Sequence, residues 1–342
     1  MFCDADSRGA GVPIEVLDHA TPGQFSGILT ESAKPVLLRG LVSDWPAVKH
    51  AQESCDELDA YLRGLYQGAT VNLFSGEPGI GGRYFYNEDM TGLNFVKSRE
   101  KLDSVLDSIR TQRNSEPAPS FYVGATTVDN CLPGFREANV LDFGRIEPLA
   151  SIWIGNRARI AAHYDLPDNL ACVVSGRRRF TLFPPDQLAN LYAGPIDFTP
   201  AGQQISLVDF HNPDLERFPA FAIALEQAFV VDMAPGDALF LPSMWWHHVE
   251  SLDDLNVLVN YWWRKSPAYM GPPIDVLYHA LLSLRDLPTE QKKAWSGIFE
   301  HYIFSDQASL EHIPEHVRGA LGPLDETMAR RLRAALLSRI NR

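Results

Sequence analysis

The middle of the chain alternates short apolar segments with turn residues. Between about Phe121 and Arg264, Gly, Pro and Asp separate runs of strand length that are rich in Val, Ile, Leu and Trp. Such runs predict β-strands. Eight are expected, at residues 149–155, 157–165, 169–176, 177–184, 229–235, 237–242, 245–251 and 256–263. Eight short strands with turns between them predict a β-barrel or jelly roll, interrupted at 186–228 by a helix (186–192) and a long loop.

The flanking regions have helical periodicity instead. Apolar stripes predict helices at 54–66, where Ser54 can cap and Glu57 follows three residues on, and at 97–110. Residues 35–45 begin as an apolar strand, and the last part of the chain predicts helices at 274–285, 289–302 and 327–340. The expected organisation is a largely helical α/β N-terminal segment (1–120), a mainly β core (121–266) and a C-terminal helical segment (267–342).

Composition and charge narrow the function classes. Hydrophobic residues make up 45% and charged residues 21%, and the net charge is −13, which fits a globular protein and disfavours a nucleic-acid partner, since binding to phosphates needs a positive surface. No apolar run approaches the ~18–20 residues of a membrane span. The polar start, Met1 to Gly11, does not resemble a signal peptide. We therefore expect a cytoplasmic protein that binds no membrane.

The cysteines do not predict a metal site or a disulfide framework. Four are present and widely separated, with no C-x-x-C pair, at positions Cys3, Cys55, Cys131 and Cys172. Free thiols are the simpler interpretation.

Two strands carry candidate metal ligands. His163 and Asp165 lie two residues apart near a strand end, so both side chains share one face. In Trp245–His248 only one histidine can face inward, and the more apolar alternate set favours His247 over His248. Alone, an H-x-D on a strand is common and seldom binds metal, and the W-W-H-H run is compatible with core aromatics and hydrogen-bonded histidines. Together, 84 residues apart on the second and seventh strands, they predict the facial triad of non-haem iron oxygenases, with three coordination positions open.

An ordered set of motifs adds a family resemblance. It includes KPVLLRGL (34–41), HYD (163–165), GRRRF (176–180), LFPPDQ (182–187), PGDALFLP (235–242), WWHHVES (245–251) and VNYW (259–262). With these the chain resembles the Jumonji C and cupin-like (cupin 8) hydroxylases, which include the asparaginyl hydroxylase that acts on hypoxia-inducible factor. The resemblance implies a double-stranded β-helix that uses Fe(II), dioxygen and 2-oxoglutarate as co-substrate, and releases succinate and CO2.

The resemblance also implies a co-substrate pocket. Tyr122, Asn169 and Asn260 match residues that line it, and Arg178 stands where the family has a lysine that pairs with the distal carboxylate. An inward Arg178 can hold a carboxylate with two parallel bonds, but arginine and lysine are not interchangeable. Ile160 replaces a threonine that contacts the co-substrate. These two departures leave the oxo-acid open, and a solvated position for Arg178 is the alternative.

Several functions remain open. The leading one is hydroxylation of a protein side chain or small molecule. The alternatives are a cupin-type metalloenzyme of another class, an isomerase or a co-substrate-free dioxygenase, and a non-catalytic metal-binding barrel. Tyr84–Tyr86 are expected either above the barrel mouth or in the core. The resemblance further implies a homodimer through the C-terminal helices, which could instead cap their own barrel.

Overall fold

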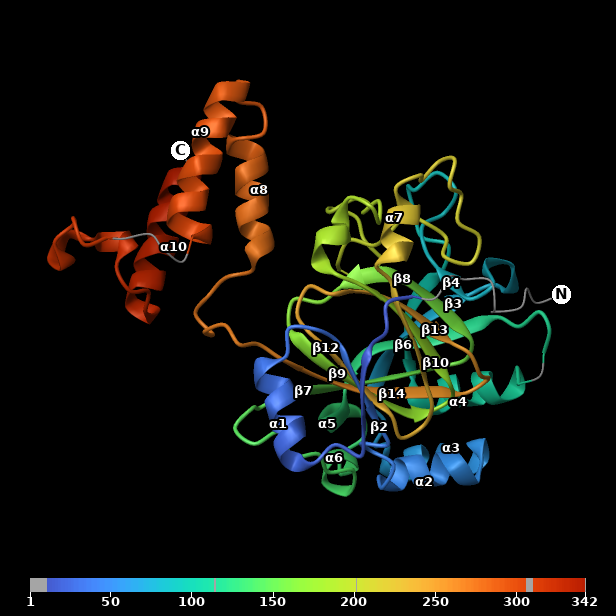
Figure 1. Cartoon of the computed structure of the whole chain (residues 1–342). Helices are drawn as coiled ribbons and strands as arrows, with labels where there is room; N and C mark the ends of the chain where they lie inside the picture. Colours follow the sequence, from blue (N-terminus) through green and yellow to red (C-terminus); the bar gives the residue numbers. More distant parts are fainter. Residues whose placement is uncertain (1–10, 114, 201, 306–309, 342) are drawn as a thin grey trace. The chain divides into compact units, whose positions relative to one another are not determined.

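The computed structural model describes residues 11–113, 115–200, 202–305 and 310–341 (Figure 1). The chain divides into two compact units, with the boundary between Arg264 and Lys265. The polar N-terminal residues that bear on targeting, Cys3 among them, lie outside the described part except Gly11. The other three cysteines, Cys55, Cys131 and Cys172, are free thiols, as expected.

The centre of the first unit is a double-stranded β-helix, which confirms the predicted fold class. One layer has the strand order β12-β9-β14-β7 and the facing layer has β11-β10-β13-β8, with every neighbouring pair antiparallel. The eight strands match those predicted from the sequence to within two residues. They are β7 (Leu149–Gly155), β8 (Ala158–Tyr164), β9 (Asp168–Ser175), β10 (Arg178–Phe183), β11 (Phe229–Met233), β12 (Ala238–Leu241), β13 (Trp246–Ser251) and β14 (Asn256–Trp263).

The N-terminal part contributes strands as well as helices. It extends the first layer to nine strands with β1 (Glu15–Asp18), β2 (Val36–Arg39), β3 (Thr70–Gly76), β5 (Val96–Lys101) and β6 (Ser120–Thr127), while β4 (Arg83–Tyr84) joins the second layer. An ion pair of 2.5 Å between Arg39 and Asp237 holds β2 against the turn before β12. Because β5 is the outermost strand of the larger sheet, one of its edges has no neighbouring strand among the described residues.

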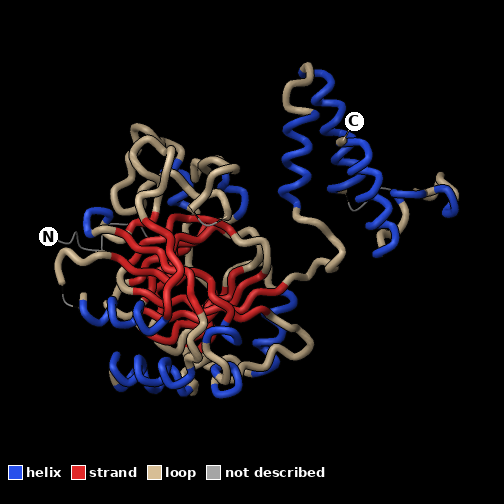
Figure 2. The backbone as a smooth tube through the Cα atoms, turned by 180° about the vertical axis from the view of Figure 1, so that it is seen from behind, coloured by secondary structure: helices blue, strands red, loops and turns tan. Residues whose placement is uncertain are grey.

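Helices cover the outer face of the larger sheet and leave the barrel interior free. They are α1 (Pro22–Glu31), α2 (Pro46–Glu53), α3 (Cys55–Leu65), α4 (Leu102–Thr111), α5 (Val128–Cys131) and α6 (Phe135–Ala138). Figure 1 and Figure 2 both show α2, α3 and α6 along one side of the strands. Their apolar side chains, such as Leu58 and Leu106, pack with Ile152 and Ile154 of β7 in the main core, whereas a smaller cluster around Phe180 fills only part of the barrel interior.

The predicted helix at 97–110 is wrong in its first third. Residues 97–101 belong to β5, which pairs with β3, and the helix begins only at Leu102. Pairing with a neighbouring strand here overrides a local helical pattern. The predicted helix at 54–66 is confirmed as α3, capped by a hydrogen bond of 3.1 Å from Glu57 N to Ser54 Oγ.

The insertion between β10 and β11 also differs from expectation. Residues 186–192 form only a 3-10 turn (Pro185–Leu188), and Tyr192, with φ of 49°, has a left-handed conformation that no α-helix continues through. The helix of this insertion is α7 (Phe221–Glu226).

The C-terminal unit contains the three helices that the sequence predicts. They are α8 (Pro273–Ser283), α9 (Thr289–Phe299), which continues as a π-helical turn (Glu300–Phe304), and α10 (Glu326–Ile340). Two 3-10 turns (Glu315–Val317 and Gly319–Leu321) precede α10. Among the described residues, no helix of either unit combines the length and apolar character needed to cross a bilayer.

Candidate active site

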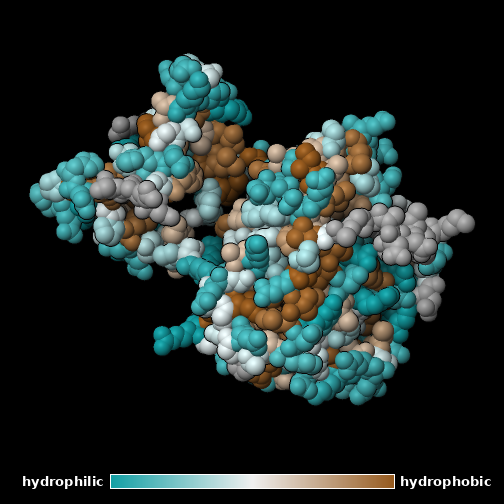
Figure 3. Space-filling model, in the orientation of Figure 1, coloured by the Kyte–Doolittle hydropathy of each residue, from teal (hydrophilic) through white to brown (hydrophobic). Residues whose placement is uncertain are grey.

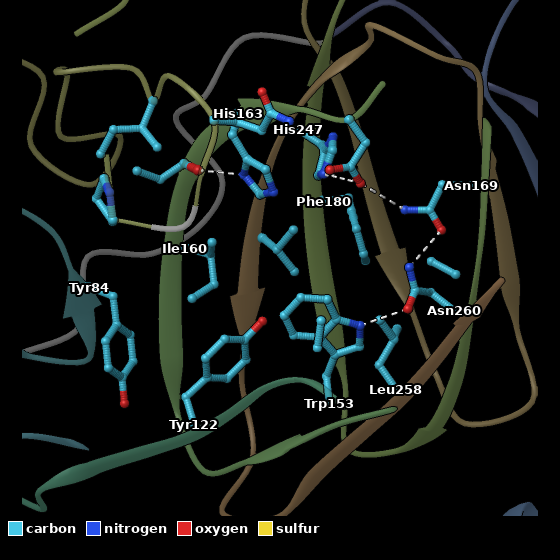
Figure 4. Close-up of a pocket in the computed structure, with 18 of the residues that line it drawn as sticks. Tyr84, Tyr122, Trp153, Ile160, His163, Asn169, Phe180, His247, Leu258 and Asn260 are labelled. Carbon is cyan, nitrogen blue, oxygen red and sulfur yellow. Dashed lines mark hydrogen bonds and ion pairs between the residues drawn. The ribbon is translucent and has the colours of Figure 1, made fainter. Parts of the chain in front are cut away.

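A cavity opens between the two layers of the barrel. It encloses about 1110 Å³ of empty space, part of which is open to solvent. All seven residues that sequence reasoning selected line this one cavity: Tyr122, His163, Asp165, Asn169, Arg178, His247 and Asn260. Figure 4 shows His163 and His247 side by side at one end, with Tyr84, Tyr122 and Trp153 at the other. The structure therefore brings together residues that are up to 138 positions apart in the chain.

His163, Asp165 and His247 come close enough to share one ion. One ligand atom of each residue lies within 4.8 Å of the others. His163 and His247 are direct cross-strand partners on β8 and β13, and their ring centroids are 4.2 Å apart. His247 Nε2 lies 3.8 Å from the Asp165 carboxylate. Two imidazoles and one carboxylate gathered on one side of a cavity form the arrangement of a facial triad.

A bulge in β8 makes this pairing possible. Val249 pairs with Ile160, but two residues earlier His247 pairs with His163, so β8 carries one extra residue. Regular alternation would place Ile160 and His163 on opposite faces. Because of the bulge both line the cavity, whereas Ala162 and Tyr164 pack into a separate cluster outside the barrel. Such bulges re-aim side chains next to active sites.

The two histidines present the same nitrogen to the cavity. His163 Nδ1 lies 2.9 Å from the Ala161 carbonyl oxygen and His247 Nδ1 lies 3.0 Å from that of Trp245. A carbonyl can only accept, so each Nδ1 carries the hydrogen and each Nε2 keeps a free lone pair. Burial, reinforced by the nearby His163, lowers the pKa of His247 to about 4 although Asp165 acts in the opposite direction. His247 is therefore neutral at pH 7, as metal ligation requires.

His248 faces away from this cavity. Its ring stacks on Phe210 at 4.6 Å, and its Nδ1 lies 3.8 Å from Glu250, whose carboxylate also contacts His211. Its partner on β10 is Thr181, whereas that of His247 is Leu182, a residue of the barrel core. The structure thus places His247 inward and His248 outward, as the alternation of apolar residues predicts.

A chain of hydrogen bonds connects Asp165 with the opposite wall (Figure 4). Asn169 Nδ2 donates to Asp165 Oδ2 at 3.3 Å, Asn260 Nδ2 donates to Asn169 Oδ1 at 3.3 Å, and Trp153 Nε1 donates to Asn260 Oδ1 at 2.8 Å. Sequence reasoning selected both asparagines but missed Trp153. Its signal was present, because Trp153 alternates with Ile152 and Ile154, which face the main core.

Arg178 is a buried cation in the cavity wall. Only 2% of the residue is exposed, and its Nε has no hydrogen-bond partner among the described residues. Burial lowers its pKa to about 10, with Tyr122 acting in the opposite direction, so it stays charged at pH 7. Its neighbours Arg177 and Arg179 are paired with Asp253 and Asp232. Of these three consecutive arginines, only Arg178 has no carboxylate partner among the described residues, which is the property expected of a carboxylate-binding group.

Aromatic side chains form most of the remaining wall. Tyr122 stacks on Trp153 with ring centroids 5.6 Å apart, and burial raises the pKa of its phenol, so it remains a neutral donor. Tyr84 lines the cavity, whereas Tyr86 is buried against Phe198. Ile160 presents an apolar side chain to the cavity. Sequence reasoning missed further lining residues from β3, from the segment just before β5 and from the insertion, since nothing local marks them: Phe74, Phe95, Pro200, Gln203 and Ile205.

Comparisons with known proteins agree on the fold family. Residues 22–269 match the model of the "Cupin-like domain" family. HSPB1-associated protein 1 of Rattus norvegicus is 29% identical over 267 residues, which are 75% of this chain and 54% of that protein. Lysine-specific demethylase JMJ31 of Arabidopsis thaliana is 39% identical over 117 residues (34% and 21%). tRNA wybutosine-synthesizing protein 5 of Gallus gallus is 32% identical over 145 residues (38% and 42%).

These matches cover about half or less of the curated relatives' own length, so their activities do not transfer as a whole. The matched family region, by contrast, spans more than two thirds of this chain and contains the whole candidate site. The chain belongs to the family of cupin-like, JmjC-type domains.

Proposed function

We propose that the protein is an Fe(II)- and 2-oxoglutarate-dependent oxygenase that hydroxylates a protein side chain or a small molecule. The observation that carries the proposal is the combination, in one cavity, of the cluster His163, Asp165 and His247 with the unpartnered cation Arg178. A metal that keeps open positions and a separate carboxylate anchor are the two requirements for binding an oxo-acid co-substrate.

The residues present fit iron(II). Two imidazole nitrogens and one carboxylate suit this ion, and nitrogen and oxygen ligands without thiolate disfavour a structural zinc site. His163 and His247 are held by backbone carbonyls, and Asp165 is held by Asn169, so hydrogen bonds already orient all three side chains. Bound iron would supply the activation of dioxygen that couples decarboxylation of 2-oxoglutarate to insertion of one oxygen atom into the substrate.

The residues present also fit a dicarboxylate. Arg178 would hold the distal carboxylate, and the neutral phenol of Tyr122 would donate a further hydrogen bond to it. Asn169 donates a hydrogen bond to Asp165 and Asn260 donates one to Asn169, and both asparagines line the cavity between the metal ligands and Arg178. The aromatic wall gives this space a mainly apolar lining.

Succinate release tests the proposal. The purified protein with Fe(II), ascorbate and 2-oxoglutarate should convert 2-oxoglutarate to succinate slowly alone and faster with a substrate, and mass spectrometry should find a product that has gained one oxygen atom. Release of succinate that does not depend on iron, or none under any of these conditions, would contradict it. Because Ile160 stands where the family has a hydrogen-bonding threonine, the preferred oxo-acid has to be tested. Oxaloacetate and pyruvate are suitable alternative co-substrates for this comparison.

We further propose that the C-terminal unit mediates homodimerisation. Neither α8 nor α9 contains a buried residue, and their apolar side chains are exposed, with Leu282 at 79% and Val276 at 61%. Figure 3 shows apolar side chains gathered on this unit. Exposed apolar surface of this kind favours association of copies. Light scattering should find a dimer for the intact chain and a monomer for Val276→Glu/Leu282→Glu, and an intact chain that is monomeric at micromolar concentration would refute this proposal.

A further inference from the structure

A groove lined by the side chains of Lys97 and Arg99 leads into the candidate active site. Lys97 and Arg99 lie on the edge strand β5, opposite Phe74 and Asn72 of β3, and all four residues line this groove. The groove shares Phe74, Trp153 and Pro200 with the cavity that contains the metal ligands. A molecule that approaches the cavity from this side therefore passes both cations first.

Lys97 stands where groove and cavity join. Its Nζ donates to the Pro200 carbonyl oxygen at 2.7 Å and lies 5.5 Å from the ring centroid of Phe74 and 5.8 Å from that of Phe95. These contacts fix a positive charge against the aromatic rings. The faces that could otherwise attract a methylated ammonium group already have a cation beside them, so a methyl-lysine side chain would be repelled.

Neither cation of the groove has a carboxylate partner. Arg99 donates to Thr70 Oγ1 at 2.7 Å, and in the described part of the chain neither Arg99 nor Lys97 takes part in an ion pair. No Asp or Glu lines the groove. Acidic residues outnumber basic ones by 43 to 30, and Arg63, Arg177 and Arg179 elsewhere are all paired with aspartates. The lining of the groove therefore carries positive charge and no carboxylate, an arrangement that attracts negative charge.

The strand that carries these cations can also pair with a peptide. β5 is the outermost strand of the nine-stranded sheet, and Val96 at its start is 65% exposed. An extended peptide can add to such an edge through backbone hydrogen bonds, and its side chains then alternate between the two faces. A nucleic acid needs an extended positive surface, whereas this groove is lined by two cations on a protein with a net charge of −13, so the observations favour a polypeptide.

We propose that the groove binds an acidic segment of a polypeptide substrate, whose carboxylates pair with Lys97 and Arg99 while an uncharged side chain enters the aromatic cavity. This inference rests on the proposed function for the reaction, but the binding it describes does not depend on turnover. It assigns the substrate class as an acidic peptide region with a neutral target residue, and it excludes methyl-lysine as the target.

Peptide binding to the full-length protein tests the inference. The probes are three fluorescein-labelled peptides with one central leucine, in which the flanking residues are glutamate, glutamine or lysine. Anisotropy should show that the glutamate peptide binds best and that its binding weakens as salt screens the charges. Lys97→Glu/Arg99→Glu should weaken this binding by about tenfold or more, because two attractions become repulsions. Lys97→Gln/Arg99→Gln should have a smaller effect in the same direction.

A matched charge reversal elsewhere is the control. Lys34 and Arg145 are exposed and lie outside the groove, so Lys34→Glu/Arg145→Glu changes the net charge equally and should leave binding unchanged. Equal binding of the three peptides, an equal loss in the control variant, or preference for a single-stranded oligonucleotide over the glutamate peptide would overturn the inference. A wild-type protein that binds the glutamate peptide but never consumes 2-oxoglutarate would refute the proposed function and leave this inference standing.

Discussion

The two faces of the β8–β13 strand pair both place histidines beside a carboxylate, but only one of them is suited to bind a metal ion. On the inner face, His163 and His247 lie beside the carboxylate of Asp165. On the outer face, His248 and His211 lie beside the carboxylate of Glu250. Both His247 and His248 are buried, and burial lowers the pKa of each to about 4.

Access and free lone pairs distinguish the two faces. The outer Glu250 carboxylate is engaged by His211, and Phe210 stacks over His248. The inner histidines direct Nδ1 to backbone carbonyls and Nε2 into a cavity that is partly open to solvent. Residue type and burial alone therefore do not define a site. What does is a set of unused ligand atoms that converge on an accessible space.

The strongest test of this comparison removes one ligand at a time. His163→Ala, Asp165→Ala and His247→Ala should each reduce iron-dependent succinate release to the level seen without iron, because three ligands are the minimum of a facial triad. The fold should survive, since the three side chains line a cavity rather than fill the core. Iron retention after gel filtration and circular dichroism provide readouts that are independent of turnover.

His248→Ala is the matched control for His247→Ala. It removes an equally buried imidazole from the same strand but from the outer face, so turnover should fall much less. If His248→Ala proves the more damaging of the two, or if any of the three inner variants retains full turnover, the assignment of the ligands is wrong.

Arg178 and Arg179 extend the comparison to β10. Arg178 faces the cavity and Arg179 pairs with Asp232 on the other side. Arg178→Ala should raise KM for 2-oxoglutarate by roughly 10- to 150-fold, since a charged hydrogen-bonded contact contributes about 1.5–3 kcal/mol. Arg179→Ala should leave KM unchanged. An unchanged KM in Arg178→Ala would remove this residue from the co-substrate site.

We expect His248, on the outer face, to make the stability of the fold depend on pH. Burial, with His211 and Arg159 nearby, lowers the pKa of His248 to about 4, while Glu250 and Asp209 act in the opposite direction. An unfolded histidine titrates near pH 6.5, so between about pH 6.5 and 4 the unfolded chain binds a proton that the folded state does not. This contribution destabilises the fold as pH falls, by about 1.4 kcal/mol for each pH unit.

His248→Gln should therefore flatten the pH dependence. The measurement is urea unfolding between pH 7 and pH 5 in the presence of a chelator, so that metal binding does not contribute. The free energy of unfolding should decrease less steeply with falling pH in the variant than in the wild type. Parallel curves would show that His248 is accessible to protons in the folded state.

The parts of this site that the sequence predicts are those with local patterns. The i, i+2 spacing of His163 and Asp165, the apolar alternation around His247 and the strand lengths of the barrel are all local. The bulge that brings His163 opposite His247 is not a local feature of the sequence, because it depends on how β8 pairs with β13. Likewise β5 contains Lys97 and Arg99 but has a helical pattern in sequence, and only pairing with β3 makes it a strand.

The smallest expected effect concerns the hydrogen-bond chain behind Asp165. Trp153→Phe keeps an aromatic ring against Tyr122 but removes the Nε1 donor to Asn260. Asn260 and Asn169 would then be free to rotate, and Asp165 would lose part of its orientation. One neutral hydrogen bond contributes about 0.5–1.5 kcal/mol, so kcat should fall by about two- to tenfold. Because Trp153 acts through Asp165, iron affinity should weaken in parallel, which a merely structural role of the indole would not cause.

Trp245→Phe is the matched control. It also removes an indole donor, but this donor bonds to the Ala33 carbonyl oxygen and takes no part in the hydrogen bonds between Trp153 and Asp165. A Trp153→Phe protein with unchanged iron affinity and kcat would show that the asparagines hold Asp165 without the indole.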